Sequence, residues 1–336
     1  MRGRDLLIVA SVLLLGGLAV ADALRSEGSS APVTRDAEPT TTRSLVTLPT
    51  APEDLGRGRF PRVPGAPGSI VFAEPPSCAL REFDVSEGFE FANVVSQSNC
   101  ELWAATVSYK VAHGIRAPRG DDAVPFQFRD LARPRRVLGH SEALFGFLVW
   151  SPDGQRAAWC NGRRVGIDLE LGGGRRLLPG CPAAYTDDGQ VALAEGNRLV
   201  VGGFTELETS GGIVFARYGT DGSVAVLVDE GRLERWEDGR RRQVLELPAG
   251  LRGRNPILSP DNCSALYRID ERIRLVDVGC SSFRPRVFPG TTAAWSPDGN
   301  WVVVGEPSRI RFYDLLRARE PVTWQVGAAQ IAWRRA

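Results

Sequence analysis

Residues 293–304, AAWSPDGNWVVV, have a close copy at residues 148–159, LVWSPDGQRAAW. In each copy an aromatic residue precedes Ser-Pro-Asp-Gly, and an apolar run follows. Proline presets the backbone for the second position of a type I turn, aspartate suits the third, and glycine accepts the left-handed conformation that closes a bulged hairpin. Both stretches therefore predict a β-hairpin whose acidic and glycine residues serve the turn. These turn residues are Asp153, Gly154, Asp298 and Gly299.

Weaker copies of the same hairpin recur about every 40 residues. The residue in front of each turn is aromatic or aliphatic, and it marks the repeat at Val95, Trp150, Tyr185, Tyr218, Leu258, Trp295 and Trp333. A period of about 40 residues is the size of one four-stranded propeller blade. The fold class predicted from this spacing is all-β, a β-propeller of four-stranded blades.

Two further patterns follow the hairpin within each period. An alternating run that ends near aspartate recurs as RVGIDLE, RIRLVDV and RIRFYDL, and an arginine-led apolar run recurs as RRLLPG, RRQVLEL, RPRRVLG and RPRVFPG. Together with the hairpin, these patterns resemble the TolB-type, WD40-like β-propeller repeat over residues 69–336. The resemblance implies an architecture that proteins of many functions share.

The final QIAWRRA, residues 330–336, supplies one strand without the rest of a blade. Because a propeller closes into a ring to hide its sheet edges, we expect this strand to complete the first blade, beside residues 70–84. Seven markers predict seven blades. Six is the alternative, because only 12 residues separate Asp84 from Ser96. The long interval after Val95 is expected to hold an insertion, residues 109–125, between the second and third strands of the second blade.

The N-terminus predicts the compartment. MRGRD is followed by 16 apolar or small residues from Leu6 to Ala21, which is typical of an export segment. We expect residues 1–24 to form a signal anchor or transmembrane helix, single-pass in a bacterial cytoplasmic membrane; cleavage at Ala-Asp-Ala, followed by secretion, is the alternative. Residues 25–68 are rich in Ser, Thr, Pro, Ala and Gly and predict a flexible linker. The propeller, residues 69–336, would then lie on the extracytoplasmic side.

Six cysteines lie beyond the export segment, and an even number in an exported chain predicts disulfides. In the blade arrangement the expected pairs are Cys78 with Cys100, Cys160 with Cys181, and Cys263 with Cys280. The first pair is assigned by elimination and proximity. The predicted strand phasing puts its two members on opposite rims of the ring, so either that phasing or that pairing is in error.

Several function classes have no support in the sequence. The net charge of +1 gives no electrostatic footprint for nucleic acid. No Cys-x-x-Cys spacing is present and the chain has two histidines, so no metal site and no cofactor are expected. Neither a Gly-x-Ser-x-Gly elbow nor a phosphate-binding loop occurs.

The sequence thus predicts a membrane-tethered, extracytoplasmic propeller that serves as a protein- or ligand-binding scaffold module of the cell envelope, and not an enzyme. Its partner is expected to be an envelope protein or a cell-wall ligand. A propeller hydrolase or lyase acting on extracellular saccharide is the alternative, since two acidic side chains could face each other across the central channel of the propeller. Extra polar loop sequence on a rigid scaffold commonly carries recognition, which favours the insertion as the binding surface. Its candidate binding residues are His113, Arg116, Arg119, Asp121 and Asp122.

Overall fold

A computed structural model describes the chain from Phe60 to Arg335, all within one compact unit, Asp54–Ala336. The description has gaps at residues 96–99, 101, 105–106, 115–123, 133–136, 144–147, 161–164, 230, 248–255 and 318, and it covers only the backbone for some strand residues between 89 and 143. The predicted export segment, 1–24, and most of the predicted linker lie outside the described residues. From Phe60 onward, no described helix has the length and apolar character needed to cross a membrane.

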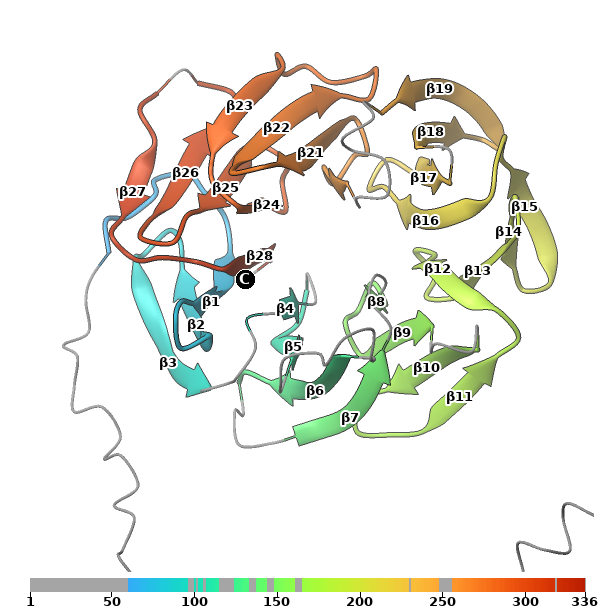
Figure 1. Cartoon of the computed structure of the whole chain (residues 1–336), viewed down its shortest axis with the longest axis horizontal. Helices are drawn as coiled ribbons and strands as arrows, with labels where there is room; N and C mark the ends of the chain where they lie inside the picture. The colour runs from blue at the N-terminus through green and yellow to red at the C-terminus, as the bar shows by residue number, and fades with distance from the viewer. Residues whose placement is uncertain are drawn as a thin grey trace, which may run out of the picture. The chain divides into compact units, whose positions relative to one another are not determined.

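The described strands form seven four-stranded antiparallel sheets, which Figure 1 shows arranged as blades around a common centre. The first blade consists of β28 (Gln330–Arg334), β1 (Ser69–Glu74), β2 (Ala79–Asp84) and β3 (Phe89–Val95). Blade 2 consists of β4 (Leu102–Ala104), β5 (Lys110–Gly114), β6 (Val124–Asp130) and β7 (Val137–Ala143). Blade 3 consists of β8 (Leu148–Trp150), β9 (Arg156–Cys160), β10 (Gly166–Glu170) and β11 (Arg175–Leu178).

The remaining four blades follow in chain order. Blade 4 consists of β12 (Cys181–Tyr185), β13 (Val191–Glu195), β14 (Arg198–Val201) and β15 (Phe204–Glu208). Blade 5 consists of β16 (Ile213–Tyr218), β17 (Val224–Val228), β18 (Arg232–Glu237) and β19 (Arg240–Glu246). Blade 6 consists of β20 (Ile257–Leu258), β21 (Ser264–Ile269), β22 (Arg272–Asp277) and β23 (Arg286–Pro289), and blade 7 of β24 (Thr292–Trp295), β25 (Trp301–Gly305), β26 (Ile310–Asp314) and β27 (Val322–Trp324). The predicted all-β propeller is confirmed, with seven blades.

The hydrophobic core is divided among the blade interfaces. Each of the seven contacts between neighbouring blades has its own cluster of buried apolar side chains. Between blades 2 and 3, for example, the ring of Phe126 meets that of Trp159 edge to face at 5.7 Å. Second strands are apolar on both faces because each lies between two neighbours, as the fully buried WVVVG of β25 shows. Because these buried side chains pack each blade against its neighbours, the first strands are held in fixed positions around the centre.

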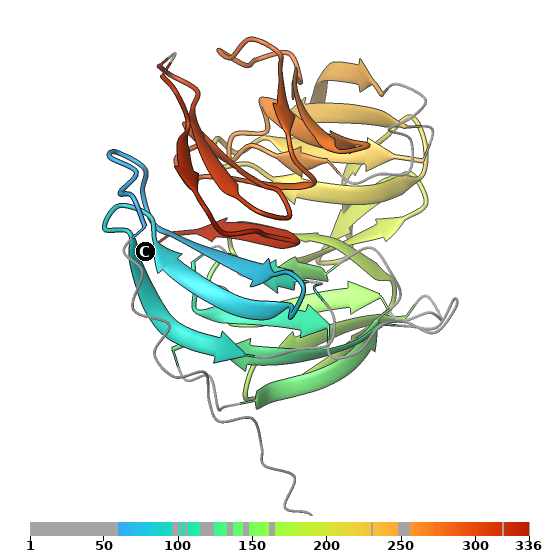
Figure 2. The same ribbon diagram turned by 60° about the vertical axis from the view of Figure 1, so that its left-hand side comes forward.

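The ring closes through the strand that comes last in the chain. β28 pairs antiparallel with β1, with Trp333 opposite Ile70 and Arg334 opposite Ser69. Figure 2 shows the red strand β28 alongside the blue strands of blade 1. The closure predicted from QIAWRRA is confirmed.

The expected phasing of the second blade was wrong. Val95 ends β3, which is the fourth strand of blade 1, and the first strand of blade 2 is β4. The expected insertion at 109–125 is also wrong in its extent, because β5 is the second strand of the blade and β6 begins at Val124. The outer strand β3 occupies the interval that had seemed too short for seven blades.

The boundary of the predicted linker is wrong at its C-terminal end. Residues 60–68 pack on blades 7 and 1: the Phe60 ring stacks on Trp324 at 4.9 Å, and Val63 is fully buried. The indole Nε1 of Trp324 donates to the carbonyl of Pro61 at 2.8 Å, and that of Trp333 donates to the carbonyl of Pro67 at 2.7 Å. This segment therefore belongs to the folded body.

Three disulfides are present, and they join the pairs expected from the sequence. They are Cys78–Cys100, Cys160–Cys181 and Cys263–Cys280. The first two connect successive blades, 1 to 2 and 3 to 4, while the third lies within blade 6. For the first pair, the predicted cysteine pairing is confirmed and the predicted strand phasing was wrong.

Candidate functional site

The turn between the first and second strands has the same internal hydrogen bonds in blades 3, 6 and 7. In blade 7, Ser296 Oγ donates to Asp298 Oδ1 at 2.5 Å, and the amide of Asn300 donates to the same oxygen at 3.1 Å. The amide of Trp301 donates to Ser296 Oγ at 2.9 Å. Gly299 has a φ of 73°, in the region that glycine accepts most easily. The acid is thus a scaffold for its own turn, as the sequence predicted for Asp153 and Asp298.

These turns surround one end of the central channel, which we call the turn-side mouth. The turns are residues 151–155, 186–190, 219–223, 259–263 and 296–300. A cavity of about 620 Å³ lies inside the ring, lined by all seven first strands and by residues from each of these five turns. Because the turns are held by buried strands and internal hydrogen bonds, the mouth has a fixed shape.

One ring of equivalent positions is lined almost entirely by small or aliphatic side chains. The position two residues before the turn is filled by Val149, Ala184, Arg217, Ile257, Ala294 and Ala332, and all six line the cavity. Arg217, on β16 of blade 5, is the single charged member of this set. The repeated blade structure does not by itself account for an arginine at this position.

Arg217 is partly buried against blade 6. Its guanidinium donates to the carbonyl oxygen of Leu258, and no carboxylate of the described residues lies within ion-pair distance of it. Burial lowers the pKa of Arg217 to about 10, an effect that the charge of Asp261 opposes. A guanidinium has five N–H donors, so most of its hydrogen-bonding capacity is not used by the described protein groups.

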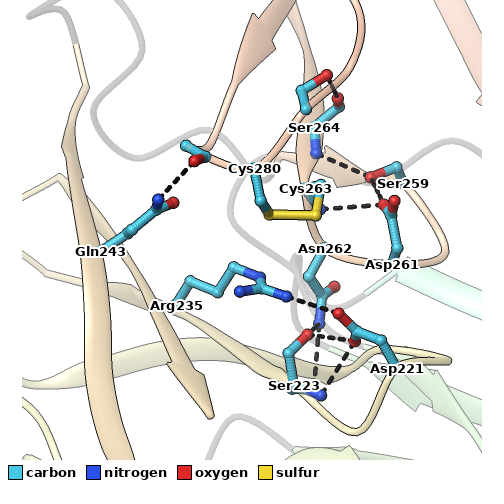
Figure 3. Close-up of a disulfide and its surroundings, with 12 residues drawn as sticks. Asp221, Ser223, Arg235, Gln243, Ser259, Asp261, Asn262, Cys263, Ser264 and Cys280 are labelled. Carbon is cyan, nitrogen blue, oxygen red and sulfur yellow. Dashed lines mark hydrogen bonds and ion pairs between the residues drawn. A yellow bond between two sulfur atoms is a disulfide. The ribbon is translucent and has the colours of Figure 1, made fainter.

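Asn262 of blade 6 fixes the backbone that carries Arg217. Its side chain is fully buried, and Nδ2 donates to the carbonyl of Arg217 at 3.2 Å and to Oγ of Ser223 at 3.2 Å. Figure 3 shows Asn262 extending from the blade 6 turn toward Ser223 of blade 5, beside the Cys263–Cys280 disulfide. Asn262 takes the place that glycine has in blades 3 and 7, with a φ of 56°. Asparagine tolerates this backbone and adds a bond between blades.

Carboxylates gather at the turn-side mouth, and those of Asp153 and Asp221 are stabilised as anions. The hydroxyl of Ser151 donates to Asp153 and is the main reason that the pKa of Asp153 lies below its usual value. Burial opposes ionisation of Asp221, but hydrogen bonds from Ser223 and the ion pair with Arg235 outweigh it, so the pKa of Asp221 is also lowered. These shifts are opposite to those of a carboxylic acid that donates a proton near neutral pH.

A second polar cluster lies behind the cavity wall, between blades 3 and 4. The hydroxyl of Tyr185, which lines the cavity, donates to Asp168 at 2.7 Å, and Asp168 also pairs with Arg156 and Arg176. Burial disfavours the charged form of Asp168, but its hydrogen bonds and ion pairs are stronger and lower its pKa. Burial and the bond to Asp168 raise the pKa of Tyr185, which stays protonated. The cluster fixes the aromatic ring at the wall.

Of the residues predicted for binding, the structure describes only the backbone of His113. The backbone of His113 lies in β5, opposite Leu102 and Gln127. The other four candidates, Arg116, Arg119, Asp121 and Asp122, lie in residues 115–123, outside the described part of the chain. Between Phe60 and Arg335, the described residues hold no group of three histidine, cysteine or acidic side chains placed to bind a metal ion.

Arg217 was missed in the sequence, although a signal for it was present. The repeats align on the residue directly before the turn, which is Tyr218 in blade 5. When the residues one position before these markers are compared across the repeats, Arg217 stands alone among aliphatic residues. What the sequence could not show is that this position faces the channel.

Comparison with known proteins gives structural likenesses alone. No protein-family model matches the chain, and no curated protein does. Among solved structures, the β-propeller domain of Cps50 (Swd1) from Myceliophteria thermophila is similar, with 14% identity, 73% of this chain and 92% of that chain covered, and a TM-score of 0.48. Dihydro-heme d1 dehydrogenase NirN, in complex with DHE, is similar with 14% identity, coverage of 85% and 78%, and a TM-score of 0.46. Neither likeness says what this chain binds or does.

Proposed function

We propose that this chain is a TolB-type binding module of the bacterial cell envelope, which recognises an envelope protein or a cell-wall ligand at the turn-side mouth. The observation that carries the proposal is the cavity of about 620 Å³ inside a ring of rigid turns. Recognition is usually built from loops that a rigid scaffold positions, and ligand sites are concave and mostly apolar with a few polar groups. The mouth has both properties.

The same proposal places the propeller outside the cytoplasm, tethered by residues 1–24 as a single-pass anchor. Three disulfides support this location, because such bonds persist mainly in oxidising compartments. Secretion after cleavage at residues 21–23 would give the same compartment without the tether. The mass of the mature chain distinguishes the two, since cleavage removes the first 23 residues.

Binding, and not saccharide hydrolysis, is the activity that the mouth favours. A glycosidase needs one carboxyl group whose pKa is raised so that it can protonate the leaving oxygen. At this mouth the pKa values of Asp153, Asp188 and Asp221 are all lowered. Their oxygens accept hydrogen bonds from their own turns, which leaves them poorly suited to proton transfer.

The test is site-specific photo-crosslinking of the full chain in its native envelope. A photoreactive amino acid replaces Pro152 or Thr220, which both line the mouth, and in a matched control replaces Val244, which is exposed on the outer strand β19. We expect a discrete crosslinked product from the two mouth positions and none from Val244. Products that do not differ between mouth and outer strand would overturn the proposed binding site, and degradation of a wall polysaccharide by the purified chain would favour the hydrolase instead.

A further inference from the structure

We propose that the channel cavity binds a small oxyanion ligand with an apolar body, and that Arg217 is the residue that holds its anionic group. The inference rests on the proposed binding function and adds the chemical class of the ligand. It assigns a carboxylate- or phosphate-bearing molecule to a site whose remaining wall is mainly apolar, with Asp187 and Arg335 as its other charged residues.

The first argument is the pattern of the wall. Five equivalent blades place valine, alanine or isoleucine where blade 5 has Arg217. A small aliphatic residue evidently satisfies the packing at this position, so the fold does not require an arginine there. One N–H of the arginine donates to the carbonyl of Leu258, and its remaining donors are available to a ligand inside the channel.

The second argument is electrostatic. Taking a guanidinium partly out of water without a carboxylate partner is unfavourable, and buried charges in proteins are normally paired. Arg217 has the carbonyl of Leu258 as its hydrogen-bond acceptor, and nearby Asp261 uses an oxygen to accept from Ser259 Oγ at 2.6 Å. An incoming oxyanion would supply the missing partner, and arginine binds carboxylate and phosphate through two parallel hydrogen bonds.

The third argument is size. A cavity of about 620 Å³ lies within the range of pockets that enclose small molecules. Its wall includes the aromatic side chains of Trp150, Tyr185 and Trp295, which suit a flat apolar body. Fixed Asn262 holds the backbone of Arg217, so the cation would meet the ligand in a set position.

The test is calorimetric titration of the full chain with three probes of similar shape: 2-naphthoate, 2-naphthyl phosphate and the neutral 2-naphthalenemethanol. In the unaltered chain we expect at least one of the two anions to bind about tenfold or more tightly than the alcohol, the scale of a charged hydrogen bond. The stronger of the two anions identifies carboxylate or phosphate as the favoured group. Equal affinity for all three probes, or no binding at millimolar concentration, would overturn the proposal without any variant.

Variants then identify the residue. Arg217→Ala gives blade 5 the residue that blades 1, 4 and 7 carry, and we expect it to remove the preference for the anion while affinity for the alcohol changes less than about twofold. Its melting temperature should equal or exceed that of the unaltered chain, because an incompletely paired buried charge is removed. Arg240→Ala, on the exposed face of β19, is the matched control and should bind as the unaltered chain does. An anion preference that survives Arg217→Ala would overturn the assignment.

The two proposals can fail separately. If anion binding depends on Arg217 but the mouth gives no specific crosslink in the envelope, the proposed function falls and the cavity site stands. If the mouth crosslinks a partner but the probes do not distinguish charge, the function stands and the oxyanion site falls.

Discussion

Arg334 and Glu82 form an ion pair that is buried on both sides, with side-chain exposures of 3% and 2%. Arg334 ends β28 and Glu82 lies in β2, so the pair reaches across β1 and joins the first strand of blade 1 to the third. Arg334 also donates to the Oγ of Ser69 at 3.0 Å and to the carbonyl of Ser108 in blade 2 at 2.8 Å. The joint that closes the ring is thus held by a charge as well as by backbone pairing.

Replacing Glu82 by Ala should lower the free energy of unfolding by about 3–5 kcal/mol, because the Arg334 guanidinium would stay buried without its anion. Removing both charges, in Glu82→Leu with Arg334→Met, should cost less than the single change. Urea denaturation followed by tryptophan fluorescence measures both. A single variant as stable as the unaltered chain would show that the pair does not support closure.

Deleting residues 327–336 removes β28 and leaves the inner edge of β1 unpaired. We expect the truncated chain to lose cooperative unfolding, since every blade interface depends on a closed ring. Differential scanning calorimetry compares it with the full chain. The closure model fails if the two chains melt alike.

The Asp168 cluster should make stability depend on acid pH. The pKa of Asp168 is lower in the folded chain than in the unfolded chain, so its contribution is present above about pH 4 and is lost as pH falls through the folded pKa. Asp168→Asn should therefore destabilise by about 2–3 kcal/mol at pH 7, with the difference shrinking at lower pH. Asp270→Asn, at an exposed turn, is the control, and both are compared by urea denaturation from pH 7 to pH 3. A difference that does not change with pH would contradict this account.

Asn262→Gly keeps a residue that accepts a positive φ but removes the hydrogen bonds to blade 5. We expect a loss of about 1–2 kcal/mol in the free energy of unfolding. Asn262→Ala should cost more, because alanine also resists the left-handed backbone. If glycine and alanine were equivalent here, the backbone argument would be wrong.

Each disulfide closes a loop of similar size, with sequence separations of 22, 21 and 17 residues. In the chain-entropy model, replacing both cysteines of one pair by alanine should cost about 3 kcal/mol. Peptide mapping without reductant checks the pairing, and denaturation of each double variant checks the energy. A free thiol at any of the six positions in the purified chain would refute the assignment.

The sequence was most informative where the turn chemistry is explicit. Trp150 and Trp295 precede complete Ser-Pro-Asp-Gly turns, and both hairpins were placed correctly. Blade 2 has no such turn near Leu102, and the marker that the sequence offers in its place, Val95, belongs to an outer strand. Without the turn, nothing local distinguishes a first strand from a fourth.

Other features depend on contacts far apart in the chain. Residues 60–68 have a linker-like composition, but they are ordered by Trp324 and Trp333, more than 260 residues away. The cavity likewise exists only once all seven first strands meet. Arg217, one of the charged residues that line the cavity, is visible in the aligned repeats, whereas its position in the channel follows from the closed ring.

The seven blades of a propeller are related by rotational pseudo-symmetry, so each presents a similar wall to the channel. A molecule bound inside would then have several equivalent orientations. Arg217 breaks this rotational pseudo-symmetry, because it is the one charged side chain among the six equivalent strand positions. An anionic ligand would therefore bind in a single orientation, with its anionic group toward blade 5. The repeated blades build the propeller, and the one residue that departs from the repeat makes one orientation of the ligand more favourable than the others.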